Sequence, residues 1–530
     1  MKKWHRILIS ISCLSLVLLG MTLPVRAEEQ FLKVAVTHGW PALDPGMWTS
    51  CTTGLNQVYE NLFRFKPGTT EVEPWLAESY DISPDKKTYT LHLRKGVKFH
   101  DGTAFNARAV VFSVDRAKWY KATGYTWLKL IEDANAVDDY TVKLTLKSPS
   151  PIFLISLAHP SVLRIVSPTT VRAHEKDGDW AKAWLEEHDA GTGPYTIKKT
   201  AKMDYIYLER FKDYWQGWEG KHLEKVLFKH VREPSSRKMM LMSKELHIAE
   251  DLIFDDVDEL RKVPYIKVDL PTTNTVSYLL FRHTGGADNP LLNRKVREAI
   301  AYAADYDEMI KVAMKGAAKR LQGPLASGLF EHDNTLKTHQ RDVEKAKRLL
   351  KEAGYKEGEI ELVIMTNIAY EWKKVVCEIL MNNLKEVGIN LDMHSTFWPR
   401  MVGSIQNGTA PPPPHMYIYY ASSVVDGYTV MTRLFHSWSI GSPEKGARGW
   451  NPGYANPEVD KVLDAAQMAP NMKKYKELML KAQEIWMEDL PSIPLWEMVF
   501  VSSMLRSVKG YIPNPIWEWE YNLYDMYLEE

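Results

Sequence analysis

Hydrophobic and polar residues alternate most regularly over residues 77–102. Tyr80 and Ile82 alternate with polar neighbours, and a turn-forming run follows at residues 83–87. Beyond that turn the same alternation continues through three apolar residues, Tyr89, Leu91 and Leu93. A period of two residues is typical of a half-buried strand. The pattern therefore predicts a β-hairpin with one buried face.

The rest of the chain mixes segments with a helical period and segments with a strand period. Apolar residues at every third or fourth position predict helices within residues 107–117, 293–304, 342–353, 375–387 and 475–486. Apolar runs or alternation predict strands within residues 31–36, 140–146, 205–211, 226–231, 277–281 and 389–393. This mixture predicts an α/β protein. The character of the chain changes near residue 275, and Pro491 and Pro494 indicate a return to the first region.

The first 27 residues have the layout of a secretory signal peptide. Basic residues precede an apolar stretch at residues 7–19, and residues 25–27 fit the small-x-small cleavage pattern. Cys13 lies inside the apolar stretch without the residues that precede a lipoprotein cysteine, so we expect no lipid anchor. An uncleaved membrane anchor is the alternative. No later stretch approaches 18 apolar residues, so we expect a soluble mature protein that starts at Glu28 in the periplasm.

Charge and length narrow the class of protein. Basic and acidic residues both number 67, and loss of residues 1–27 removes four basic residues and no acid. The mature chain then carries about four net negative charges, which provides no electrostatic surface for nucleic acid or an anionic membrane. Roughly 500 residues are too many for one simple core and predict two or three domains.

Motifs for cofactor and metal chemistry are missing from the sequence. It contains no GxGxxG, Walker loop, HExxH or CxxC motif, so we expect no cofactor and no metal site. His38, His92 and His100 are expected at the surface or in caps. Cys51 and Cys377 remain after cleavage, and free, partly buried thiols are favoured over a disulfide between them. A secreted hydrolase that uses two carboxylates is a minor alternative.

Several segments, in chain order, resemble one known family. The hairpin at residues 77–102 is followed by NARAVVFSVDRA at 106–117, GTGPY at 191–195, LERFKDYWQG at 208–217, LEKVLFK at 223–229, and the helical stretches 289–310 and 342–355. Together they resemble the family 5 extracellular solute-binding proteins, the peptide- and nickel-type receptors that serve ABC importers. The resemblance covers essentially the whole mature chain.

This resemblance implies a two-lobed periplasmic binding protein fold, type II-like, with an inserted subdomain and a hinge between the lobes. Lobe I is expected from residues 28–70, 190–275 and 490–530, the inserted subdomain from 71–189, and lobe II from 276–489. The implied function is non-covalent capture of a peptide or peptide-like solute between the lobes and delivery to an ABC permease and ATPase complex in the inner membrane, as a monomer. A non-peptide solute (an oligosaccharide, an opine or a nickel chelate) and delivery to a chemosensor are the alternatives.

The resemblance also places one ligand-reading position. Peptide-binding members have an aspartate four residues before a proline, where it pairs with the α-ammonium of the ligand. Here these two positions hold Ser423 and Gly427, and Asp426 lies three residues after Ser423. A neutral hydroxyl supplies no charge to offset burial of an ammonium group. Our hypothesis is therefore that this receptor does not read a free peptide N-terminus in the usual way.

Other candidate ligand-binding residues are polar or aromatic and lie in loops that face the cleft in the family. The full set of candidates, with those above, is Trp48, Thr49, Ser50, Thr52, Tyr125, Trp127, Phe397, Trp398, Tyr420, Ser422, Ser423 and Asp426. The hydroxyls near Thr49 could instead cap turns, and most of the 18 tryptophans are expected in cores or interfaces. Trp398 and Tyr420 are the strongest aromatic candidates.

Overall fold

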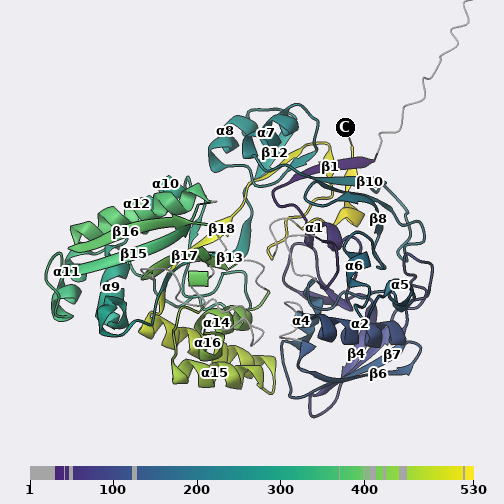
Figure 1. The fold of residues 1–530 in the computed structure, drawn as a ribbon, viewed down its shortest axis with the longest axis horizontal. Coiled ribbons are helices and arrows are strands. Elements are labelled where there is room, and N and C mark those ends of the chain that lie inside the picture. The colour runs from purple at the N-terminus through teal and green to yellow at the C-terminus, as the bar shows by residue number, and fades with distance from the viewer. Residues whose placement is uncertain are drawn as a thin grey trace, which may run out of the picture.

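The structure is a computed structural model. It describes residues 30–40, 42–46, 52–121, 128–368, 370–397, 400–401, 403–404, 414–421, 425–440, 451–516 and 520–529, without the side chains of residues 52 and 287. Two main sheets and one smaller sheet organise the chain (Figure 1).

A seven-stranded sheet forms the centre of the first lobe. Its strand order is β12 (Ile266–Asp269), β19 (Ser502–Leu505), β11 (Ile248–Ala249), β1 (Phe31–Val36), β10 (Lys225–His230), β9 (Tyr205–Arg210) and β8 (Tyr195–Ala201). The buried β1 pairs in parallel with β10 and β11, whereas the outer strands pair antiparallel. The short helices near it are α1 (Thr52–Leu55), α5 (Pro168–His174), α6 (Lys182–Leu185), α7 (Pro234–Met242) and α8 (Val257–Arg261). Segments far apart in the sequence therefore build one sheet.

A six-stranded sheet carries the second lobe. Its order is β14 (Lys319–Arg320), β18 (Ser492–Val499), β13 (Thr272–Phe281), β17 (Met416–Ala421), β15 (Ile360–Asn367) and β16 (Ile389–Thr396). The helices of its apolar core are α9 (Arg294–Ala303), α10 (Tyr306–Ala313), α11 (Val343–Glu352) and α12 (Glu371–Glu386). Helices α14 (Gly427–Phe435), α15 (Pro457–Gln467) and α16 (Met472–Asp489) lie beyond β17, below the sheet in Figure 1.

The inserted subdomain holds a four-stranded antiparallel sheet packed against α2. The order is β4 (Ala77–Ile82), β5 (Thr88–Leu93), β7 (Thr141–Leu146) and β6 (Ile131–Asp138), with α2 at Ala107–Tyr120 and α4 at Phe153–Ala158. Two further strand pairs are β2 (Phe63–Phe65) with β3 (Val72–Pro74) and β20 (Val508–Lys509) with β21 (Tyr527–Leu528). The subdomain touches the second lobe, because the Lys86 ammonium donates to the Pro470 carbonyl and the Lys129 ammonium lies 5.8 Å from the Trp438 ring centre.

The predicted hairpin forms, but only one of its strands has a buried face. Tyr89, Leu91 and Leu93 of β5 are buried, as expected. Tyr80 and Ile82 of β4 are 39% and 44% exposed, so the expectation of a buried face is wrong for this strand. β4 is the edge strand of its sheet, and an edge strand has a neighbour on one side only.

The two lobes are joined side by side by the chain segments around residues 271 and 500. The Phe500 amide donates to the Pro271 carbonyl at 3.3 Å. The predicted boundaries at 275/276 and 489/490 differ from the sheet pairings, because β13 starts at Thr272 and β18 pairs with β13 in the six-stranded sheet. The chain therefore returns to the seven-stranded sheet after β18, and not before β18 as predicted.

Candidate functional site

The carboxyl ends of three parallel strands meet at one edge of the six-stranded sheet. β15 pairs in parallel with both β16 and β17, and the pairing with β16 continues to Asn367 opposite Thr396. In open α/β sheets, ligands bind in the crevice outside the carboxyl ends of the strands. The segments that follow these three strands contain Phe397, Trp398, Ser422, Ser423 and Asp426 of the candidate set, and Tyr420 lies at the end of β17.

Tyr420 forms a pair with a second tyrosine that the sequence did not single out. The hydroxyls of Tyr420 and Tyr370 lie 2.7 Å apart, and the rings are nearly perpendicular with centres 5.6 Å apart. Both residues are half-buried. The pair therefore presents aromatic surface and hydroxyl groups together at the strand ends.

Lys373 lies beneath this pair and was also missed. Its side chain is fully buried, and its ammonium nitrogen is 4.6 Å from the ring centre of Tyr420 and 4.8 Å from that of Tyr370. Burial lowers the pKa of Lys373 to about 7. Helical spacing was the available signal, because Lys373 lies three residues before Val376 and four before Cys377, both on the inward face of α12.

Asp426 caps a helix. One carboxylate oxygen accepts from the Thr429 amide at 2.7 Å, and the other accepts from the Thr429 hydroxyl at 2.8 Å. Burial, with a smaller contribution from Glu331, raises the pKa of Asp426 to about 7. The carboxylate of Asp426 thus caps the N-terminus of α14, and its contact with the solute stays a prediction.

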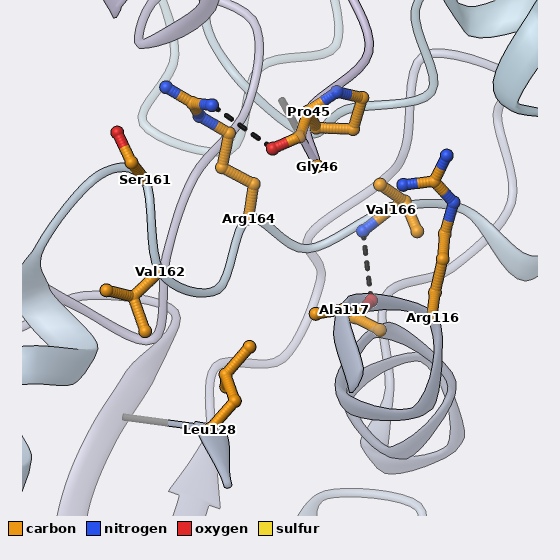
Figure 2. A pocket seen from close by; sticks show the side chains of 10 residues that line it. Pro45, Gly46, Arg116, Ala117, Leu128, Ser161, Val162, Arg164 and Val166 are labelled. Atoms are coloured by element: carbon orange, nitrogen blue, oxygen red, sulfur yellow. Dashed lines mark hydrogen bonds between the residues drawn. The ribbon is translucent and has the colours of Figure 1, made fainter. Parts of the chain in front are cut away.

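In the inserted subdomain, a small cavity lies between α2 and the loop at residues 161–166, and Pro45 and Gly46 of the first lobe also line it (Figure 2). Arg164 donates to the Pro45 carbonyl at 3.2 Å on its wall, and Arg116 forms a fully buried ion pair with Asp44. The cavity measures about 20 Å³, room for roughly one water molecule. Solute pockets provide roughly 300–1,000 Å³, so this cavity cannot hold a solute by itself.

Most of the other candidates lie outside the described residues. These are Trp48, Thr49, Ser50, Tyr125, Trp127, Trp398, Ser422 and Ser423, together with Cys51 and the side chain of Thr52, whose backbone starts α1. Gly46 and Leu128 line the small cavity, and each is next in sequence to a stretch that contains some of these candidates. Phe397 is described and is 70% exposed just after β16. The contacts of the other candidates stay predictions.

The family-like motifs converge on one buried carboxylate, Glu60. It accepts hydrogen bonds from Trp75 Nε1, the Tyr214 hydroxyl and the Thr192 hydroxyl at 2.8–2.9 Å, and from Trp215 Nε1 at 3.2 Å. Thr192 belongs to the GTGPY string, and Tyr214 and Trp215 belong to the DYW string. Burial raises the pKa of Glu60 despite these donors. The motifs therefore hold the scaffold together.

The end of the hairpin joins the same scaffold through His100. Its Nδ1 lies 2.5 Å from an Asp189 oxygen and its Nε2 lies 2.9 Å from the Gly193 carbonyl oxygen. Burial alone would lower the pKa of His100, but the Asp189 carboxylate outweighs it and the pKa is raised. The expectation of a surface position is wrong for His100, since the imidazole is buried between two segments of the first lobe.

Other expectations concern metals, thiols and membranes. Among the described residues, no cluster of three or more His, Cys, Asp or Glu side chains is placed to hold a metal ion. Cys377 is a buried free thiol, and burial raises its pKa to about 12. In the part of the chain that the structure describes, no helix is long and apolar enough to cross a membrane.

Comparison with known proteins agrees with this architecture. Residues 71–442 match the family described as bacterial extracellular solute-binding proteins, family 5, middle part. The glutathione-binding protein GsiB of Pectobacterium atrosepticum is 30% identical over 504 residues, 93% of either chain. The periplasmic binding protein DppA of Helicobacter pylori, solved with the peptide STSA, is 27% identical with a TM-score of 0.79, over 94% of this chain and 98% of its own.

A more distant structure shows the same fold. NikZ of Campylobacter jejuni, solved with Ni(L-His), superposes with a TM-score of 0.81 at 21% identity, over 94% of this chain and 99% of its own. The two-lobed α/β architecture is thus shared with these binding proteins. This chain belongs to the bacterial extracellular solute-binding proteins of family 5.

Proposed function

We propose that this protein is the substrate-binding component of an ABC importer and captures a peptide or peptide-like solute between its two lobes. The observation that carries the proposal is the 30% identity to a glutathione-binding protein along 93% of both chains. The strand-end site with its Tyr370–Tyr420 pair provides a surface that suits such a solute. Glutathione, a γ-glutamyl tripeptide, is the first ligand to test.

The proposal includes export to the periplasm through a cleaved signal peptide, action as a monomer, and delivery of the solute to an inner-membrane permease and its ATPase. Binding without turnover is part of the proposal. Closure of the lobes is driven by the contacts that the solute gains in the closed state. A non-peptide solute is the second candidate, favoured by Ser423 at the position of the ammonium-binding aspartate.

Native mass spectrometry of the purified protein, followed by isothermal titration calorimetry, tests this proposal. The probes are glutathione, the dipeptide Met-Leu and the tetrapeptide Ser-Thr-Ser-Ala. We expect stoichiometric binding of at least one probe without product formation. Co-purification of a sugar, an opine or a metal chelate together with no binding of the three peptides would replace the peptide assignment by the second candidate.

A further inference from the structure

The buried Lys373 and the start of α12 form an unassigned group of hydrogen-bond donors at the strand-end site. Among the described residues the Lys373 ammonium has no hydrogen-bond acceptor. The next residue, Lys374, is exposed and lies 3.7 Å from Glu371 and 3.8 Å from Glu378. The acids of α12 are therefore on its solvent side, and Lys373 lies away from them.

Aromatic rings surround the ammonium group. Tyr420 and Tyr370 lie at the distances given above, and the Trp372 ring centre lies 5.4 Å away. The neighbouring Cys377 is not a counter-charge, because its thiol is neutral at physiological pH. Ring faces attract a cation but accept none of its three N–H bonds in the geometry of a hydrogen bond. Among the described residues, the ammonium is thus screened by rings and has no anion beside it.

Lys373 is the third residue of α12, so the N-terminal end of this helix belongs to the same segment. This 16-residue helix starts without a side-chain hydrogen bond at its N-cap residue Tyr370, as far as the described residues show. Side chains cap α2, α9, α10, α11, α14, α15 and α16, whereas α7 also starts without a side-chain cap. The N-terminus of a helix favours an anion through its backbone N–H groups and its dipole. The Lys373 ammonium, which has no acceptor among the described residues, and the N-terminal end of α12 therefore favour the same ligand chemistry, an anion.

We propose that Lys373 and the first turn of α12 form a subsite for a carboxylate of the bound solute. The proposal rests on the proposed capture of a peptide-like solute, whose C-terminal or glutamyl carboxylate is the group to be bound. Tyr370, Trp372 and Tyr420 are half-buried and cover the ammonium. The proposal therefore requires one of these rings to rotate so that the carboxylate reaches Lys373. The carboxylate then accepts hydrogen bonds from the ammonium, which becomes fully protonated because its counter-charge has arrived.

Calorimetry on the full mature protein tests the subsite with the variants K373M and K374M. The probes are glutathione, Met-Leu and Ser-Thr-Ser-Ala, each as the free acid and as the C-terminal amide. We expect the wild type and K374M to bind at least one acid tenfold or more tightly than its amide, and K373M to lose that preference. For glutathione, whose second carboxylate stays free in the amide, K373M is expected to weaken binding tenfold or more.

A second readout separates a direct charge contact from a structural role. At pH 8, titrations in buffers of different ionisation enthalpy should show proton uptake on binding by the wild type and K374M, and none by K373M. An acid preference and proton uptake that persist in K373M overturn the subsite and leave the peptide function standing. The same holds if the wild type binds acid and amide equally and glutathione binding does not change in K373M.

Failure of the proposed function has a different signature. If the wild type binds none of the probes, the peptide assignment fails, and the thermal midpoint of the ligand-free proteins at pH 7 decides the role of Lys373. A higher midpoint for K373M than for the wild type, with K374M unchanged, supports a lysine retained for an anion. A lower midpoint for K373M identifies a structural lysine and overturns the subsite.

Discussion

Replacement of Lys373 by methionine should stabilise the ligand-free protein, and the gain should depend on pH. In the folded protein the ammonium is buried without an acceptor among the described residues, whereas in the unfolded chain water solvates it. Methionine fills a similar volume and needs no proton and no acceptor. The substitution therefore removes the free-energy cost of folding a charged lysine into this position.

The size of the effect follows from the two pKa values of the lysine. Burial lowers its pKa from 10.5 to about 7, and one pKa unit corresponds to about 1.4 kcal/mol. Between these values the unfolded chain binds the proton and the folded protein does not, so the stability of the wild type rises with pH. The cost of protonated Lys373 is fully present below pH 7, reaches roughly 5 kcal/mol at most, and disappears as the pH approaches 10.5.

Urea unfolding of the wild type, K373M and K374M at half-unit steps from pH 6.5 to 10 measures this dependence. The difference between K373M and the wild type should be largest at pH 6.5 and shrink by about 1.4 kcal/mol per pH unit above pH 7. Other groups that titrate in this range cancel in the difference, and K374M should follow the wild type. A difference that stays flat from pH 7 to pH 10 would refute the reasoning, because it would mean that Lys373 titrates as it does in water.

Three further substitutions and one ligand comparison probe the scaffold and the site. E60Q should lower the free energy of unfolding by about 2–4 kcal/mol, because the amide nitrogen of the new glutamine would face two hydrogen-bond donors. The control E71Q, at an exposed position, should change the free energy of unfolding little. Equal thermal midpoints for E60Q and the wild type would contradict the role of Glu60. G191A should lower the free energy of unfolding by roughly 1–3 kcal/mol or more, because the added Cβ would lie 1.9 Å from the Val58 carbonyl oxygen. An unchanged thermal midpoint would show that the two backbone segments can move apart. Because the pKa of Asp426 is raised to about 7, the wild type should lose stability as the pH rises from about 4 to about 7. In D426N, urea unfolding should show a smaller loss of stability over this pH range. An unchanged pH dependence in D426N would count against the raised pKa. N-acetylated dipeptides should bind as tightly as free ones in calorimetry if Ser423 replaces the ammonium-binding aspartate, and tight binding of free dipeptides alone would refute that hypothesis.

The sequence predicted the parts of the fold that depend on local pattern. The period-two segment gave the hairpin, and the helical stripes gave α9, α11, α12 and α16. The exposure of Tyr80 could not be predicted, because it depends on β4 being the edge strand of the sheet. The place of β18 could not be predicted either, because a strand carries no local mark of the sheet that its backbone joins.

One residue of the candidate strand-end site was singled out from the sequence, and its contact with the solute stays a prediction. Tyr420 was chosen because it is an aromatic residue close to the ligand-reading position that the family resemblance places at Ser423. Lys373 was missed because a lysine next to Lys374 and close to Glu371 looks like part of a solvated helix face. Only the helical spacing to Val376 and Cys377 places it on the inward side. Charge type therefore misleads where the fold buries a cation.

Recognition of the family and recognition of the solute depend on different residues. The strings that identify the family hold Thr192, Tyr214 and Trp215 on Glu60, and His100 on Asp189. A change at these buried groups costs stability whichever solute is carried. Tyr370, Lys373 and Tyr420 lie in the strand-end segments of the second lobe. The motif residues around Glu60 do not determine which side chains occupy these segments. Receptors of this fold that bind different solutes should therefore differ at these strand ends and share the residues around Glu60. The sequence motifs thus identify the fold but not the solute.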